Sequence, residues 1–187
     1  LVQTGYLTIE SASVTGRTRQ YRLVFPNFEI EESFSYWLAK GFSALPDQEL
    51  SSGLRGMVEA LQAGAVDAML EHLKVFFHDV PSDIAIAKEK YYQTIFYTVF
   101  TLIGAMIEAE ARTSLGRIDA VVKTKTDIFL FEFKLRDTAE AALRQIREKR
   151  YAERYLSDGR RVTLVGVAFD AEARNLGRWL IEPAPAA

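Results

Sequence analysis

The chain has 187 residues, of which 49% are hydrophobic and 12% are aromatic, and its formal net charge is −2. This length and apolar content are sufficient for one globular core. The chain contains no cysteine, which excludes disulfides, thiolate nucleophiles and zinc or iron–sulfur sites held by cysteine.

The first elements of the chain are a predicted hairpin and a predicted helix. Residues 5–10 and 20–25 are rich in strand-forming side chains, and Gly16 between them predicts a β-hairpin. Asn27 then predicts the N-cap of an amphipathic helix, because an asparagine side chain can accept a hydrogen bond from the first helical turn.

A helical region follows, with patterns near 50–63 and 65–78 separated by Gly64. Charge is unevenly spread, because residues 29–89 carry eleven acids and four bases, whereas residues 144–161 carry seven bases and three acids. The basic segment is typical either of a contact with a polyanion or of a solvated helix face.

The second half alternates helices and strands. A long helix is predicted from about 83 to 103, and three strand-like segments follow at 104–113, 116–124 and 127–135. Their short connections predict an antiparallel meander.

The last elements are a helix, a strand and a short helix. Asp137 with Glu140 predicts a capping box for a helix over 138–157, which Gly159 ends. A buried strand is expected at 162–169, and a final short helix is expected to hold Leu176 and Trp179.

The segment 95–107 is too short and too polar to span a bilayer, so no membrane association is expected. Nothing at the start resembles a signal peptide, and the chain opens on Leu1 instead of methionine. We therefore expect a fragment of a longer, cytoplasmic protein.

Two opposite charges interrupt the apolar strand at 127–135. Side chains of a strand alternate between faces, so Glu132 and Lys134 share one face while Phe131 and Phe133 share the other. Charges are costly in a covered sheet unless they are paired, exposed at a strand end or bound to metal. This pair therefore indicates a functional site.

Two further carboxylates occur in apolar surroundings. Asp119 lies in the middle strand of the predicted meander, which can bring it close to Glu132. Glu89 falls on the apolar stripe of the long helix, where either a functional role or a helix-end position in water is possible.

These groups have a common chemistry. Carboxylate oxygens suit Mg²⁺ or Mn²⁺, so Asp119, Glu132 and the backbone carbonyl of Phe133 are candidate ligands. Lys134 offers a positive charge that can orient an attacking water or stabilise a phosphoryl transition state.

The combination of Glu89, Asp119, Glu132 and Lys134 resembles the PD-(D/E)XK nuclease superfamily. The phrases GRID, FEFKL and VGVAF resemble the branch found C-terminal to AAA-ATPase-like domains in bacterial proteins. The resemblance implies a restriction-endonuclease-like α/β core of helix, three-stranded meander, helix and strand, preceded by an N-terminal hairpin and a helical extension. It also implies an N-terminal ATPase-like partner domain, with residues 1–45 as the connecting hairpin and helix and residues 46–187 as the nuclease-like domain.

The resemblance assigns roles to further residues. Glu110 competes with Glu89 as the additional acid. Arg117 is expected either to neutralise a phosphate or to pair with Glu110. Gln145 and Tyr151 resemble a glutamine and a tyrosine near the scissile phosphate, although Gln145 can equally belong to a polar patch and Tyr151 can pack on the sheet.

Three functions follow as hypotheses. The first is a nuclease that uses Mg²⁺ or Mn²⁺ to hydrolyse phosphodiester bonds, in DNA rather than RNA. The second is a nucleic-acid-binding or regulatory module of the same fold that does not cleave. The third is a structural domain that docks to the ATPase-like part through the acidic region 29–89.

Overall fold

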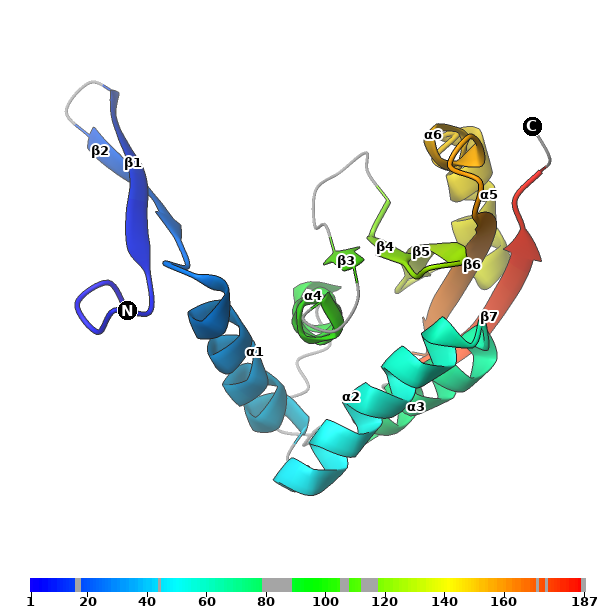
Figure 1. Ribbon diagram of the computed structural model, residues 1–187, viewed down its shortest axis with the longest axis horizontal. Coiled ribbons are helices and arrows are strands. Elements are labelled where there is room, and N and C mark those ends of the chain that lie inside the picture. Colours follow the sequence, from blue (N-terminus) through cyan, green and yellow to red (C-terminus); the bar gives the residue numbers. More distant parts are fainter. Residues whose placement is uncertain are drawn as a thin grey trace.

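The computed structural model describes residues 1–15, 18–43, 45–78, 89–104, 108–111, 118–170, 172–173 and 175–185. These residues form a mixed α/β architecture (Figure 1), so the α/β class predicted from the sequence is confirmed. The helices are α1 (Phe28–Ser43), α2 (Asp47–Gln62), α3 (Val66–His78), α4 (Glu89–Gly104), α5 (Ala139–Glu148) and α6 (Glu153–Leu156). The strands are β1 (Thr8–Thr15), β2 (Thr18–Val24), β3 (Glu108–Ala111), β4 (Ala120–Lys123), β5 (Asp127–Lys134), β6 (Arg161–Asp170) and β7 (Asn175–Pro183).

A two-stranded hairpin and α1 form the N-terminal part. β1 and β2 pair antiparallel, so the predicted hairpin is confirmed. Asn27 caps α1 as predicted, because its Oδ1 accepts a hydrogen bond from the Ile30 N–H at 2.9 Å. The hairpin projects away from the rest of the chain (Figure 1).

Helices α2 and α3 confirm the two helical patterns on either side of Gly64. This glycine has a φ of +73°, a left-handed conformation that glycine adopts without a Cβ clash, and the chain reverses there. Among the described residues, no helix is both long enough and apolar enough to cross a lipid bilayer. The two helices contribute these buried side chains to one core: Leu54, Met57, Leu61, Met69, Leu70 and Leu73.

The central sheet has the strand order β3-β4-β5-β6-β7 in the described part of the chain. β3, β4 and β5 pair antiparallel, which confirms the predicted meander. The chain then passes through α5 and α6 to β6, which pairs parallel with β5, and β7 pairs antiparallel with β6.

Helices cover both faces of this sheet. On one face, Phe129, Phe131 and Phe133 of β5 pack in the core that contains α2, α3 and α4. On the other face, Ile128 and Leu130 pack in a second core that contains α5. A charge on β5 is therefore enclosed unless it lies near the end of the strand.

The C-terminal segment corrects one prediction. Residues 175–183 form the edge strand β7, so the prediction of a short helix holding Leu176 and Trp179 is wrong. The segment pairs with β6, and the Trp179 Nε1–H donates to Asp67 Oδ1 of α3 at 2.9 Å. These tertiary contacts override the local helical pattern.

The start of α5 corrects a second prediction. Thr138 is the N-cap, because its Oγ1 accepts from the Ala141 N–H at 3.1 Å. Asp137 accepts from the Thr138 N–H at 2.8 Å instead. The predicted capping box of Asp137 and Glu140 is therefore wrong by one residue.

The predicted helix over 138–157 is divided into α5 and α6. The chain leaves the helix after Glu148, and Arg150 adopts a φ of +55°. A left-handed residue cannot continue a right-handed helix, so the chain turns before α6 begins. Gly159, with a φ of +90°, follows α6 in the turn that leads to β6.

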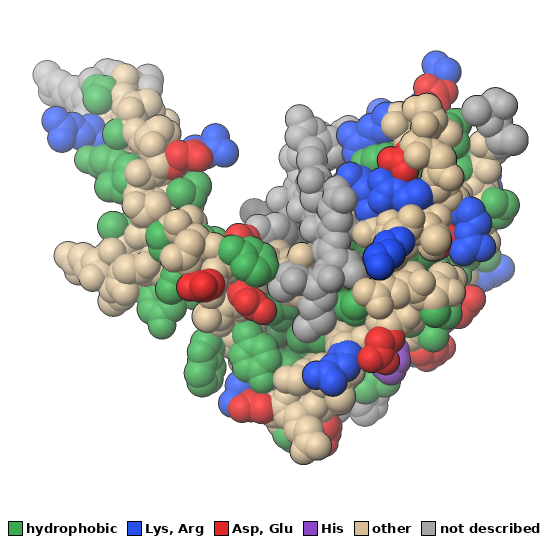
Figure 2. All heavy atoms as spheres, viewed as in Figure 1, with side chains coloured by type: hydrophobic (Ala, Val, Ile, Leu, Met, Phe, Trp, Pro, Cys, Tyr) green, Lys and Arg blue, Asp and Glu red, His purple; other side chains and the backbone are tan. Residues whose placement is uncertain are grey.

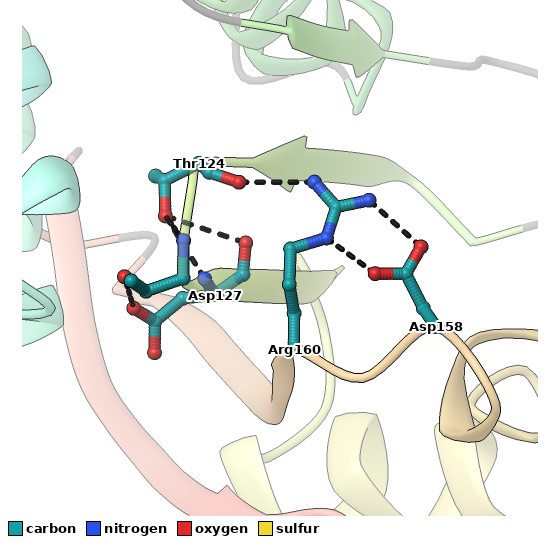
Figure 3. A network of polar contacts seen from close by, with 5 residues as sticks. Thr124, Asp127, Asp158 and Arg160 are labelled. Atoms are coloured by element: carbon teal, nitrogen blue, oxygen red, sulfur yellow. Dashed lines mark hydrogen bonds and ion pairs between the residues drawn. The ribbon is translucent and has the colours of Figure 1, made fainter.

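A polar network fixes the beginning of β5 (Figure 3). The Thr124 N–H donates to the Asp127 carbonyl at 2.8 Å, and the Asp127 N–H donates to Thr124 Oγ1 at 3.0 Å. Arg160 donates to the Thr124 carbonyl at 2.9 Å and to Asp158 Oδ2 at 2.8 Å. The network ties the β4–β5 turn to the loop before β6.

Candidate active site

Glu132 and Lys134 lie at the C-terminal end of β5, on the face that α5 covers. Ile128 and Leu130 precede them on this face, because side chains of a strand alternate. The side chain of Glu132 is 3% exposed and that of Lys134 is 22% exposed. The pair therefore lies where the buried sheet meets the solvent.

Asp119 lies just before β4, directly opposite Glu132 of the neighbouring strand β5. The register pairs Ala120 with Phe131, and its continuation by one residue sets Asp119 opposite Glu132. Directly opposed residues of an antiparallel pair share a face, with Cβ atoms about 5 Å apart. Asp119 Oδ2 also accepts a hydrogen bond from the Phe133 N–H at 2.9 Å, which holds its carboxylate against β5.

Gln145 of α5 joins the charged pair. The Lys134 ammonium lies 3.1 Å from Glu132 Oε1 and also donates to Gln145 Oε1. The Gln145 amide in turn donates from Nε2 to Glu132 Oε1. Each of the three side chains therefore restrains the other two, and the lysine ammonium has a defined position.

The pKa of Glu132 is raised from 4.5 to about 7, mainly by burial and next by the nearby charge of Asp119. Lys134 and the Asp119 backbone amide oppose this rise, because they favour the charged carboxylate. Glu132 Oε2 is buried and accepts no hydrogen bond from the described residues. A carboxylate in this state would be stabilised by a cation.

A close approach of α5 to the sheet places Gln145. Gly166 of β6 pairs with Glu132, and a Cβ at this position would lie 2.5 Å from the Ala139 carbonyl oxygen and 2.9 Å from Leu143 Cγ. Only a residue without a Cβ allows α5 to pack at this distance. The helix can therefore deliver Gln145 to the end of β5.

Tyr151 follows α5 and packs against the core on the α5 side of the sheet. Its hydroxyl is buried and makes no hydrogen bond of good geometry to the described residues. Burial raises the pKa of Tyr151, and the charge of Glu132 raises it as well, whereas the nearby Gln145 lowers it. The tyrosine thus packs on the sheet and has its hydroxyl close to the carboxylates.

A sequence model of the PD-(D/E)XK nuclease superfamily matches residues 87–179, which include Asp119, Glu132 and Lys134. The chain belongs to the PD-(D/E)XK nuclease superfamily. The mixed sheet and its flanking helices are consistent with the restriction-endonuclease-like fold expected for this superfamily.

The alignment with one relative covers more of this chain than the superfamily model does. The "Uncharacterized protein in vnfD 5'region" of Azotobacter chroococcum mcd 1 is 32% identical over 190 aligned positions, which cover 97% of this chain. The alignment covers 36% of that protein, so the chain spans about a third of the length of its relative. No solved structure matches the chain.

Three of the residues predicted for the superfamily site are described incompletely. Glu89 is the first residue of α4, and Glu110 pairs with Val121 in the β3–β4 ladder, but the side chains of both acids lie outside the described part. Arg117 lies outside the described residues altogether. The choice between Glu89 and Glu110 stays a prediction.

The donor set of this superfamily member fits a hard divalent cation. Asp119 and Glu132 converge on one face, and Glu132 has a buried oxygen without a hydrogen bond. Carboxylate oxygens are the ligands that Mg²⁺ and Mn²⁺ prefer. The described residues contain no cluster of three or more acids or histidines that could hold a metal, so a complete site needs a further oxygen donor.

Sequence reasoning missed two residues that shape this region. Gly166, within an otherwise apolar strand, permits the approach of α5, and an isolated glycine in a strand was the available signal. Asp127 is a second buried carboxylate on β5, with Arg161 as its partner. Its position beside a threonine-rich turn was the available signal.

Proposed function

We propose that this domain is a metal-dependent nuclease that hydrolyses phosphodiester bonds, in DNA rather than RNA. The observation that carries the proposal is the convergence of Asp119 and Glu132 beside Lys134, at the end of β5, in a member of the PD-(D/E)XK nuclease superfamily. Two acids that can hold a divalent cation, together with a fixed ammonium, can catalyse phosphodiester hydrolysis.

Asp119, Glu132 and the backbone carbonyl of Phe133 would hold the cation, with Glu89 or Glu110 as the further donor. A bound Mg²⁺ or Mn²⁺ polarises a phosphoryl oxygen and lowers the pKa of water. The Phe133 N–H holds Asp119 in place for this role.

Lys134 is proposed to act on the phosphate or on the attacking water. Its side chain is partly exposed, and its ammonium is held by Glu132 and Gln145 with a third N–H left to donate a further hydrogen bond. A positioned positive charge stabilises the negative charge that develops on the phosphoryl oxygens. Gln145 is a positioning residue, because it acts through Glu132 and Lys134.

The basic segment 144–161 supports binding of a polyanion only in part. Arg147 pairs with Glu182, Arg150 with Glu153 and Arg160 with Asp158, so these charges are partly neutralised. Arg161 pairs with Asp127 as well. The exposed Arg144 and Lys149 add positive charge on and just after α5. Phosphate contacts by such residues would give affinity without sequence preference.

The wider setting is also a proposal. We retain residues 1–45 as a connecting part, residues 46–187 as the nuclease-like domain, and an ATPase-like domain as its partner in a longer cytoplasmic protein. The resemblance of GRID, FEFKL and VGVAF supports the ATPase-like partner. The relative from Azotobacter chroococcum supports a longer protein, because the homologous region makes up 36% of its length.

The test is cleavage of single-stranded DNA, double-stranded DNA and RNA in Mg²⁺, in Mn²⁺ and in a chelator. We expect metal-dependent cleavage that falls at least about 100-fold in Lys134→Ala and in Asp119→Ala. Lys125→Ala is the matched control, because Lys125 is an exposed lysine in the β4–β5 turn at the other end of the sheet.

Cleavage that survives both substitutions would contradict the assigned site. Salt-sensitive binding without turnover in any metal would instead identify a nucleic-acid-binding module that keeps the fold.

A further inference from the structure

The hairpin of β1 and β2 has one apolar face and one polar face. The register pairs Ile9 with Leu23, Ala12 with Tyr21 and Val14 with Arg19. Because paired residues of an antiparallel ladder share a face, these six side chains lie on one side. The opposite side carries the polar residues Thr8, Ser11, Ser13, Thr18, Gln20 and Arg22, together with Val24.

A β-bulge creates this segregation. The register shifts between Ile9 and Ser11, which leaves Glu10 as an extra residue in β1. Without the extra residue, Ile9 would lie on the face opposite to Ala12 and Val14, because alternate residues of a strand change sides. A β-bulge can redirect side chains from one face of a strand to the other, and such bulges are functional features of a fold and not defects. Here the bulge gathers the apolar side chains on one face.

The apolar face is open to solvent. Ile9 is 49% exposed, Val14 67%, Tyr21 51% and Leu23 44%. The base of the hairpin is anchored through the ring of Phe34 in α1, which lies 5.4 Å from that of Phe25 and 6.0 Å from that of Tyr6. A two-stranded sheet is marginally stable by itself, so a covered apolar face would stabilise it.

The tip of the hairpin carries a basic residue, and the helix at its base begins with acidic residues. Arg19 lies near the tip, on the apolar face, and its side chain is exposed. At the base, α1 begins with the acids Glu29 and Glu31, and Glu32 follows. Figure 2 shows hydrophobic and basic side chains on the projecting hairpin, and acidic side chains both partway along it and where it joins the rest of the molecule. The acid partway along the hairpin is Glu10, which pairs with Arg22 at 2.7 Å.

We propose that the apolar face of the hairpin, defined by Ile9, Ala12, Val14, Tyr21 and Leu23, binds the same face of a second copy of this chain. An antiparallel arrangement of the two hairpins buries both apolar faces at once. It also sets the basic tip of each copy over the acidic base of the other. A two-fold interface of this kind is self-complementary, because each contact occurs twice.

The oligomeric state of the full chain, measured by sedimentation velocity over a range of concentrations, tests the proposal. We expect a dimer whose dissociation constant rises about 100-fold or more in Tyr21→Asp and in Leu23→Asp. The matched controls are Gln20→Asp and Ser13→Asp, which add the same charge on the opposite face and should leave the dimer unchanged. Unchanged thermal melting of the helical core would show that each variant folds.

A charge exchange tests the antiparallel arrangement. Arg19→Glu and the pair Glu29→Arg with Glu32→Arg should each weaken the dimer, and the combination of all three should restore it. A dimer that resists Tyr21→Asp and Leu23→Asp would overturn the proposal. A wild-type chain that stays monomeric would overturn it too, and if Arg19→Glu then lowered binding of a DNA duplex, the hairpin would be a nucleic-acid contact.

Discussion

Each end of β5 buries a carboxylate, and the two carboxylates differ in how many of their oxygens have a hydrogen-bond or ion-pair partner. At the beginning of the strand, Asp127 is 3% exposed and both of its oxygens are bonded. Arg161 Nε lies 2.9 Å from Oδ1, while Arg161 Nη2 and the Thr126 hydroxyl lie 3.1 Å and 2.6 Å from Oδ2. At the end of the strand, Glu132 is 2% exposed, but its Oε2 accepts no hydrogen bond from the described residues.

This difference separates a structural carboxylate from a candidate catalytic one. Asp127 has a partner for each oxygen, so its charge is compensated within the fold. Glu132 shares one oxygen between Lys134 and Gln145 and faces a second acid, Asp119, which raises its pKa. A site left incompletely satisfied by the protein alone is typical of one that binds a ligand.

The largest expected effect is on cleavage. Glu132→Gln should lower metal-dependent cleavage on the order of 1,000-fold, because it removes the proposed metal ligand and the charged partner of Lys134. Asp127→Asn should leave cleavage by the folded protein unchanged. Single-turnover cleavage at saturating Mn²⁺ measures the rate of each variant. An equal loss of cleavage in the two variants would contradict the distinction between a catalytic Glu132 and a structural Asp127.

The next effect is on the pH dependence of stability in the metal-free protein. The folded-state pKa of Glu132 is about 7, above its ordinary value of 4.5, so its contribution is fully present below pH 4.5 and is lost as the pH rises through 7. The free energy of unfolding should therefore fall by about 3 kcal/mol over this window.

Glu132→Gln is the control for this pH effect, because glutamine does not titrate. Denaturant unfolding in a chelator, at several pH values, gives the difference between the wild type and this variant. Parallel stability curves for the two proteins would show that the pKa of Glu132 is not raised.

The smallest expected effect concerns Asp127. Asp127→Asn should lower the free energy of unfolding by about 2 kcal/mol, because an amide replaces an oxygen that accepts from Thr126 and Arg161. At pH 8, Glu132→Gln should lower the free energy of unfolding by less than Asp127→Asn does, or should raise it, because glutamine removes a charge that is costly to bury. Urea denaturation of the two variants measures this, and the reverse order of stability would contradict the structural role of Asp127.

Much of the candidate site could be predicted from the sequence. Glu132 and Lys134 are two residues apart in an apolar strand, so their common face followed from strand geometry. Asp119 could be assigned to the neighbouring strand of a meander. The contacts of Gln145 with Glu132 and Lys134 could not be predicted, because they depend on how closely α5 approaches the sheet at Gly166. The short helix predicted to hold Leu176 and Trp179 is instead part of the strand β7, because pairing with β6 decides the conformation of this segment.

The sequence by itself determined which side chains of β5 share a face, because alternation is a property of the extended backbone. It also determined where the helices α1, α2 and α3 form, since their apolar spacing and the conformational freedom of Gly64 are local. Only the tertiary structure decided that Asp119 lies across from Glu132, that Gln145 reaches both Glu132 and Lys134, and that Asp127 is compensated by Arg161. Strand register and helix packing depend on contacts between segments far apart in the chain, so local patterns do not specify them.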